Sequence, residues 1–141
     1  MNYDMGFNKE CLLTANIPVS SMDERDAFSS ELLNNPNIKE VAWSQDRMVA
    51  DSRMTWGRNH HGEQMMLTVM PVSWNFLQVM GIEVFEGRDF LPSDEKGDGA
   101  IILNEYAKNK YNLNLEEVIE WNGTYLYHEA PPVEYHIEFL C

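Results

Sequence analysis

The chain has 141 residues, a hydrophobic fraction of 44% and a formal net charge of −13, from 23 acidic and 10 basic residues. This length favours one domain, spanning residues 1–141, with a core of its own. The excess of carboxylates argues against a nucleic-acid partner, because it would repel a phosphate backbone. Cations and cationic partners remain open, as does the simpler interpretation that the acidity keeps the domain soluble.

Two cysteines are present, Cys11 in the first apolar stretch and Cys141. The sequence leaves open whether they form a disulfide or whether Cys11 is a small core residue. No stretch approaches the about twenty apolar residues that cross a bilayer, and the N-terminus lacks the pattern of a signal peptide. As printed, the chain is expected to be soluble.

Residues 10–45 predict a strand, a helix and a second strand. The first strand covers 10–19 and is ended by Pro18, and the second covers 38–45. Between them, Ser20 or Ser21 can cap a helix over 22–33. The residues expected to face the core from this helix are Met22, Ala27, Phe28, Leu32 and Leu33.

Residues 46–64 are polar and predict a hairpin with an exposed tip at 56–62. Trp56, Arg58, His60 and His61 give this tip a mixture of side chains suited to partner recognition. The two histidines with Glu63 could also suggest a metal cluster. Adjacent side chains of a strand point apart, however, so a polar loop tip is the preferred interpretation.

Residues 65–90 predict a second strand–helix–strand unit. Ser73 is the expected cap of a helix over 74–80, and Gly81 is its expected end. The apolar residues of 82–85 then predict a strand, followed by the charged Arg88-Asp89 turn. Phe76 and Met80 are expected to share one core with Phe28 and Leu32 of the first helix.

The remaining residues predict a loop over 91–99, a short strand at 100–103 and a helix that Asn104 caps and Glu105 begins. A small helix at 113–119 and a hairpin whose last strand covers 133–139 complete the chain. The predicted fold class is therefore α+β, with strand–helix–strand units forming a mixed or antiparallel sheet and helices on one face, as in ferredoxin-like folds.

No nucleophile stands beside a base, and no glycine-rich phosphate loop is present, so we expect neither an enzyme nor a cofactor. Asp94, Asp98, Gly99 and Glu105 match part of an EF-hand calcium loop, but Lys96 stands where an oxygen ligand belongs. A second alternative is an adaptable groove for an apolar ligand, although core packing explains its residues better. The groove would be formed by Met65, Met66, Met70, Met80, Trp43, Trp56 and Trp74.

Two blocks of the sequence carry a family resemblance. They comprise Val72, Asn75-Phe76, Met80-Gly81-Ile82, Glu86-Gly87-Arg88-Asp89-Phe90 and Asp94, followed by Ile101-Ile102, Asn104-Glu105, Ala107 and Tyr111. In this spacing, and with Gly6-Phe7 near the start, the chain resembles the extracytoplasmic domain of ABC-transporter permeases of the MacB/FtsX type. Within these blocks, Gly81, Gly87, Arg88, Asp89, Phe90, Asn104 and Glu105 are expected to be structural. The family usually continues through a glycine-containing strand that has no counterpart here, so an incomplete C-terminal end stays an open alternative.

The resemblance implies a non-catalytic domain, related to the porter-like half of the family's domain, on the periplasmic side of the bacterial inner membrane. Transmembrane helices outside this chain would anchor it, and an ABC ATPase subunit or domain would drive it. The domain would bind a periplasmic adaptor or cargo and couple ATP hydrolysis to export or to work outside the membrane. The alternative is a free-standing acidic module that binds an apolar ligand in the Met/Trp groove or calcium in the Asp94 loop.

Overall fold

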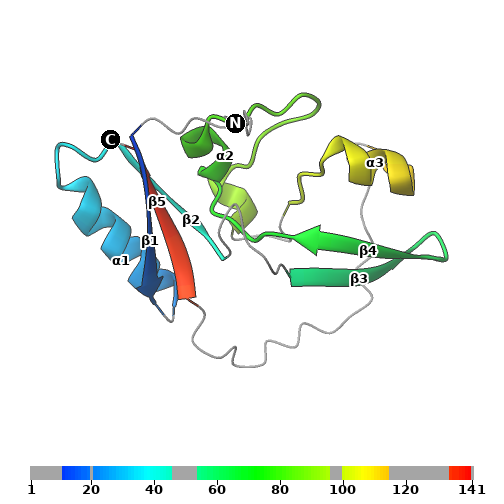
Figure 1. Cartoon of the computed structure of the whole chain (residues 1–141), viewed down its shortest axis with the longest axis horizontal. Helices are drawn as coiled ribbons and strands as arrows, with labels where there is room; N and C mark the ends of the chain where they lie inside the picture. The colour runs from blue at the N-terminus through cyan, green and yellow to red at the C-terminus, as the bar shows by residue number, and fades with distance from the viewer. Residues whose placement is uncertain (1–10, 20, 46–53, 96–99, 115–133, 141) are drawn as a thin grey trace, which may run out of the picture.

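The computed structural model describes residues 11–19, 21–45, 54–95, 100–114 and 134–140. The described part is an α+β fold in which two antiparallel sheets are accompanied by three α-helices (Figure 1). Its elements are β1 (Leu12–Pro18), α1 (Met22–Leu33), β2 (Glu40–Ser44), β3 (Met54–His60), β4 (Glu63–Val69), α2 (Phe76–Met80), the 3-10 helix η1 (Pro92–Glu95), α3 (Glu105–Tyr111) and β5 (Glu134–Leu140).

The larger sheet has the strand order β1-β5-β2, and β5 is antiparallel to both neighbours. The strands β1 and β2 are therefore parallel to each other, with β5 inserted between them, and α1 connects them. This arrangement confirms the first strand–helix–strand unit and the antiparallel alternative for the sheet. The strand that completes the sheet comes from the far end of the sequence.

Helix α1 has the predicted bounds, and the Ser21 hydroxyl caps it by accepting a 3.2 Å hydrogen bond from the Glu24 backbone N–H. The predicted core stripe is only partly right. Phe28 and Leu32 pack towards β2, whereas Met22, Ala27 and Leu33 are exposed. The helix is rotated about its axis relative to the predicted orientation. In the structure Ser29 faces the sheet and accepts a 2.7 Å hydrogen bond from the Trp43 indole N–H.

Strand β2 is buried on both faces, which separates the core into two clusters. Val41 and Trp43 pack under α1 with Phe28 and Leu32. Ala42, between them in the strand, packs against α2 through Phe76, Val79 and Met80. Since successive side chains of a strand point to opposite faces, α1 and α2 lie on opposite sides of the sheet (Figure 1). The predictions of helices on one face and of one shared core are therefore wrong.

Residues 71–75 cover the edge of β2 that β5 leaves open. Gln45 donates to the Pro71 carbonyl at 2.9 Å, and the Ser73 N–H donates to the Trp43 carbonyl at 2.8 Å. Side chains then replace the main chain: Ser73 Oγ accepts from the Trp43 N–H at 2.9 Å, and Asn75 Nδ2 donates to the Val41 carbonyl at 3.0 Å. This pairing satisfies groups that an edge strand otherwise exposes.

The same contacts explain why α2 is shorter than predicted. Ser73 was the expected cap, but its hydroxyl is bonded to β2 and to Asn75 Oδ1, so the N-cap position falls to Asn75 and the helix begins at Phe76. Gly81 ends the helix as expected, with a left-handed φ of 66°.

The second strand–helix–strand unit does not form. Strand β4 pairs with β3 in a separate two-stranded sheet, and residues 82–85 and 100–103 are not strands. An apolar, β-branched run becomes a strand only where it pairs with another strand, and residues 71–75 already cover the edge of β2 that lies beside α2. Of the predicted tail, the strand near 133–139 is confirmed as β5. The rest of that hairpin and residues 115–119 lie outside the described residues.

Candidate functional site

The second half of the first resembling block forms one local structure, here called the Arg88 loop (residues 82–95). The Arg88 guanidinium binds the Asp94 carboxylate in bidentate fashion, at 2.8 Å from Nη1 to Oδ2 and 3.0 Å from Nη2 to Oδ1. Nη1 also donates to the Asp89 carbonyl at 2.9 Å. Gly87, with φ 89°, supplies a backbone turn just before the arginine that other residues rarely adopt.

Asp94 also fixes the start of η1, because its Oδ2 accepts a 2.7 Å hydrogen bond from the Leu91 N–H. The hydrogen bond from Arg88, followed by that from Leu91, lowers the pKa of the Asp94 carboxyl below its usual value. The same pair raises the pKa of Arg88. Asp89 Oδ1 accepts a 2.7 Å hydrogen bond from the Phe90 N–H.

The Arg88 loop is fastened to its neighbours on both sides. Glu86 forms an ion pair with Lys108 of α3, and Glu95 Oε1 accepts a 3.0 Å hydrogen bond from the Trp74 N–H, just before α2. Phe85, in the same loop, has a relative exposure of 103%, so its ring is exposed to solvent. The sequence pattern placed Phe85 in a strand and missed this exposed aromatic side chain.

Helix α3 begins as predicted, since Asn104 Oδ1 accepts a 2.8 Å hydrogen bond from the Ala107 N–H and Glu105 lies in the first turn. The other end of the helix is attached to β4. The Tyr111 hydroxyl donates to the Met66 carbonyl at 2.9 Å and accepts from the Met66 N–H at 3.1 Å. This contact lowers the pKa of Tyr111, and its hydroxyl in turn raises the pKa of Lys110.

The predicted hairpin is present as β3 and β4, but its tip is shorter than the predicted tip at 56–62. The turn is formed by His61 and Gly62, whose φ values of 49° and 81° fit a two-residue type I′ turn. Trp56 and Arg58 lie within β3, and His60 is only 6% exposed. The expectation that the two histidines point apart is wrong: their ring centroids are 4.1 Å apart, because His61 is left-handed rather than extended.

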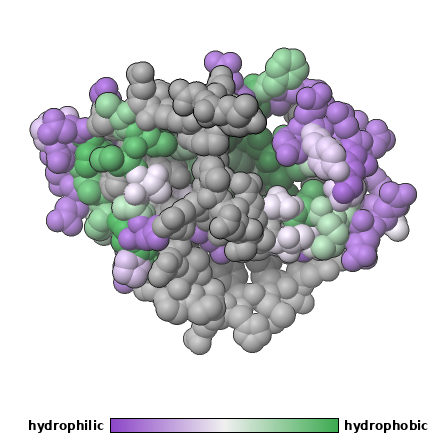
Figure 2. Space-filling model, in the orientation of Figure 1, coloured by the Kyte–Doolittle hydropathy of each residue, from purple (hydrophilic) through white to green (hydrophobic). Residues whose placement is uncertain are grey.

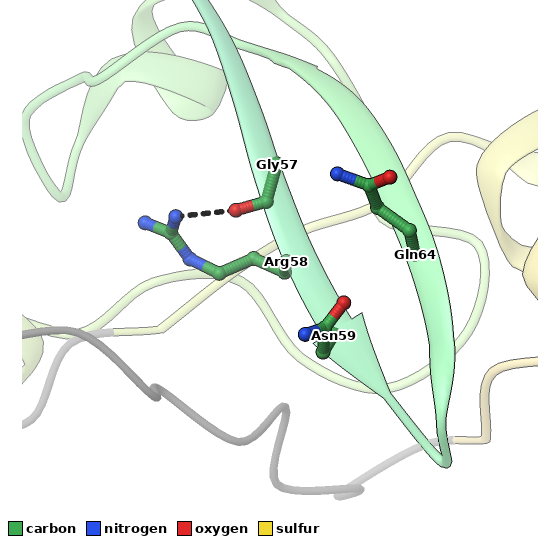
Figure 3. A pocket seen from close by; sticks show the side chains of 4 residues that line it. All are labelled: Gly57, Arg58, Asn59 and Gln64. Carbon is green, nitrogen blue, oxygen red and sulfur yellow. Dashed lines mark hydrogen bonds between the residues drawn. The ribbon is translucent and has the colours of Figure 1, made fainter.

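Arg58 folds back over its own strand, on the side away from β4 (Figure 3). Its Nη1 donates to the Gly57 carbonyl at 2.8 Å, and its guanidinium carbon lies 4.9 Å from the centre of the Trp56 ring. A hollow beside it is lined by Gly57, Arg58, Asn59 and Gln64. Trp56, Arg58 and His60 alternate with the other residues of β3 and so share one face of the strand.

The Met/Trp groove does not form in the described residues. Trp43 and Met80 are buried on opposite faces of the sheet, Met65 is buried in the hairpin, and Met66 and Trp74 are exposed. Within the same described part, no group of three or more His, Cys, Asp or Glu side chains is arranged to hold a metal ion. Asp94, the first position of the calcium-loop pattern, already uses both oxygens to bind Arg88, while 96–99 lie outside the described residues.

Hydrophilic residues dominate the end of the molecule where α3 and the hairpin lie, in the face that Figure 2 shows.

No helix among the described residues is long and apolar enough to cross a membrane. Comparisons with protein-family models, with curated proteins and with solved structures find no significant match.

Proposed function

We propose that the chain is a non-catalytic, extracytoplasmic domain of an ABC-transporter permease of the MacB/FtsX type, which binds a periplasmic adaptor or cargo. ATP would be hydrolysed by a separate ATPase subunit or domain, and membrane helices outside this chain would transmit the movement. The domain would then lie on the periplasmic side of the inner membrane.

The observation that carries the proposal is the Arg88 loop. Gly81 and Gly87 take left-handed conformations, and Arg88 binds the aspartate that the resembling block contains. Asn104, from the second block, caps the helix whose Lys108 binds Glu86. The matched residues therefore have specific structural uses, as expected if the resemblance reflects a common fold. The split β-α-β sheet is compatible with a porter-like half of the family's domain.

The face of β3 that carries Trp56 and Arg58 is the partner-binding element in this proposal. A tryptophan with an arginine stacked on it is a common pair at the centre of protein interfaces. His60 is buried and His61 lies in the turn, so the accessible part of this surface is formed by the half-buried Trp56 and Arg58 within the strand rather than by the tip.

The first test is the parent reading frame, which should encode apolar segments of about twenty residues outside both ends of this chain. Their absence would remove the permease assignment. The second test is the double variant Trp56→Ala/Arg58→Ala in the intact transporter. We expect partner affinity or export to fall about tenfold or more, with basal ATPase turnover retained.

The matched control is Thr55→Ala/Thr68→Ala, a cross-strand pair of exposed side chains on the opposite face of the same hairpin. This control should leave export and partner affinity unchanged. Equal export by both double variants would exclude this face from the mechanism.

A further inference from the structure

Strand β1 is the edge of the larger sheet that no other segment of the described chain covers. It lies at the margin of the sheet and pairs with β5 on one side, along all seven residues of Leu12–Pro18 (Figure 1). The opposite edge of this sheet, on β2, is covered by residues 71–75. An uncovered edge strand presents a row of main-chain N–H and C=O groups that can pair with another strand.

The separate hairpin differs from β1, because side chains cover the middle of both its edges. The Arg58 guanidinium donates to the Gly57 carbonyl of β3 at 2.8 Å. The Tyr111 hydroxyl bonds to the N–H and the carbonyl of Met66, which lies opposite Gly57 in the ladder. In the part of the chain that the structure describes, no side-chain hydrogen bond of this kind covers Leu12–Pro18. Strand β1 is therefore the least protected of these edges.

The stretch that contains β1 carries no charge in a strongly acidic chain. Residues 11–22 include none of the 23 acidic and 10 basic residues. Natural edge strands often carry a charged side chain, which prevents pairing with another chain. Pro18 blocks only the end of β1, where it lacks an N–H. Two copies with a net charge of −13 each would repel each other least along this stretch.

The side chains of β1 are complementary to those of a second β1 that runs in the opposite direction. With the two strands centred on Ala15, Leu13 lies opposite Ile17 of the second copy. In the same register, Thr14 lies opposite Asn16 of the second copy.

This register also covers an exposed apolar side chain. Ala15 and Ile17 pack against the core cluster under α1, and Leu13 points to the same face because side chains of a strand alternate. Leu13 is nevertheless 64% exposed. Pairing would cover it with an isoleucine, while the exposed Thr14 and Asn16 would meet on the other face.

We propose that the chain forms a homodimer in which β1 pairs antiparallel with β1 of a second copy, around a two-fold axis at Ala15. The two three-stranded sheets become one sheet of six strands. Because the axis is perpendicular to the sheet, both α1 helices lie on the same face and the Leu13–Ile17 pair occurs twice. The contact uses the same surface of each copy, so association stops at the dimer.

The dimer is expected to be weak, because one strand on each side is a smaller contact than a standard protein interface. The inference does not rest on the proposed function. It uses the main-chain edge of the larger sheet and not the Trp56 and Arg58 face of the hairpin. Its test needs no transporter, so its failure would leave the permease proposal unaffected.

Sedimentation velocity of the full chain, from about 1 μM to about 1 mM, measures the association. We expect a reversible monomer–dimer equilibrium without larger species. Leu13→Lys should weaken the dimer at least about tenfold, because it removes both Leu13–Ile17 pairs and puts a charge on the edge. The matched control is Leu91→Lys, which makes the same change at an exposed leucine of the Arg88 loop and should leave the dimer unchanged.

The register is tested by cross-linking in a Cys11→Ser/Cys141→Ser chain; Cys11 is exposed and is not a core residue. Ala15→Cys places two cysteines opposite each other at the axis, with Cα atoms about 4.5–5.5 Å apart, a distance that a disulfide can bridge. It should form disulfide-linked dimers faster than Leu13→Cys, although Leu13 is the more exposed position.

Three results would overturn the proposal. The first is a chain that stays monomeric at about 1 mM or forms open-ended aggregates instead of dimers. The second is a Leu13→Lys variant that dimerises as well as the unchanged chain. The third is faster cross-linking by Leu13→Cys than by Ala15→Cys, because it would show that exposure and not register sets the rate.

Discussion

At the scale of single residues, Phe76 and Phe85 have the same side chain in opposite surroundings. Phe76 is completely buried between α2 and the sheet, whereas Phe85 is completely exposed in the Arg88 loop. Burial of a phenylalanine contributes to stability through the apolar area removed from water and through close packing. Only the first of these residues can therefore contribute much to the free energy of unfolding.

We expect Phe76→Ala to lower the free energy of unfolding by about 3–5 kcal/mol, through lost burial and the cavity that remains. Phe85→Ala is the matched control and should change it by less than about 0.5 kcal/mol. Denaturant unfolding measures both variants. Similar losses in the two variants would contradict the burial of Phe76 in the core.

The ion pair of Asp94 with Arg88 makes the stability of the folded chain depend on pH. Its pKa in the folded chain is lowered, mainly by Arg88, so its contribution to stability is present at pH values above the ordinary range of aspartate. The contribution is lost as the pH falls through the lowered folded value. Carboxyl NMR titration should place the Asp94 pKa below the usual value, and Arg88→Gln should raise it. An Asp94 pKa that does not respond to Arg88→Gln would show that the ion pair does not form.

At the scale of elements, two buried serines lie at the edge of β2, and only one of them bonds through its hydroxyl to the described residues around it. Ser73 accepts from the Trp43 N–H and donates to Asn75. Ser44 is equally buried, but its hydroxyl has no hydrogen-bond partner within the described part of the chain. Ser73→Ala should cost about 1–3 kcal/mol, because it leaves buried polar groups unsatisfied.

Ser44→Ala, the control for Ser73→Ala, should be neutral or slightly stabilising, since it removes a buried polar group that makes no such bond. Thermal or denaturant unfolding distinguishes the two variants. A Ser44→Ala variant as unstable as Ser73→Ala would refute this account of the edge.

Helix α3 is attached to β4 by one hydroxyl group. Tyr111→Phe removes both hydrogen bonds to the Met66 main chain and should increase hydrogen exchange at the Met66 amide about fivefold, as expected for a loss of roughly 1 kcal/mol. Tyr106→Phe changes an exposed tyrosine of the same helix and should leave that amide unaffected. Unchanged exchange in Tyr111→Phe would mean that the hydroxyl does not protect the edge of β4.

Elements with local signals could be predicted from the sequence. The bounds of α1 follow from Ser21 and the acidic first turn, the end of α2 from Gly81, and the start of α3 from Asn104. The start of α2 could not be predicted, because Ser73 bonds to a strand that lies far away in sequence. Residues 82–85 have the composition of a strand but pair with no strand of the structure, and composition carries no information about pairing.

The candidate site was predictable in the same limited way. The charged turn at Arg88-Asp89 and the loop that follows it were predicted from the sequence. The bidentate pairing of Arg88 with Asp94 was not predicted, since the sequence does not give the path of the chain between them. The burial of His60 was missed because the polar composition of 56–62 conceals the alternation of a strand.

At the scale of the whole molecule, the sheet depends on contacts that are distant in sequence. Strand β5 lies between β1 and β2, so these two strands have no direct pairing with each other. Both core clusters also use β2. Such non-local pairing costs chain entropy before it gives stabilising contacts.

Truncation after Pro132 should therefore remove the cooperative unfolding transition of the sheet and both helix-bearing cores, although it leaves β1, α1, β2 and α2 in the chain. Far-UV circular dichroism with denaturant would measure this loss.

A synthetic peptide of residues 133–141, added in excess, should restore the transition by binding between β1 and β2, because binding to the native state raises stability by mass action. The matched control is the same peptide with Ile137→Pro, which removes a main-chain N–H in the middle of β5 and should fail to restore it. A truncated chain that still unfolds cooperatively without the peptide would show that β1 and β2 reach a stable sheet without β5.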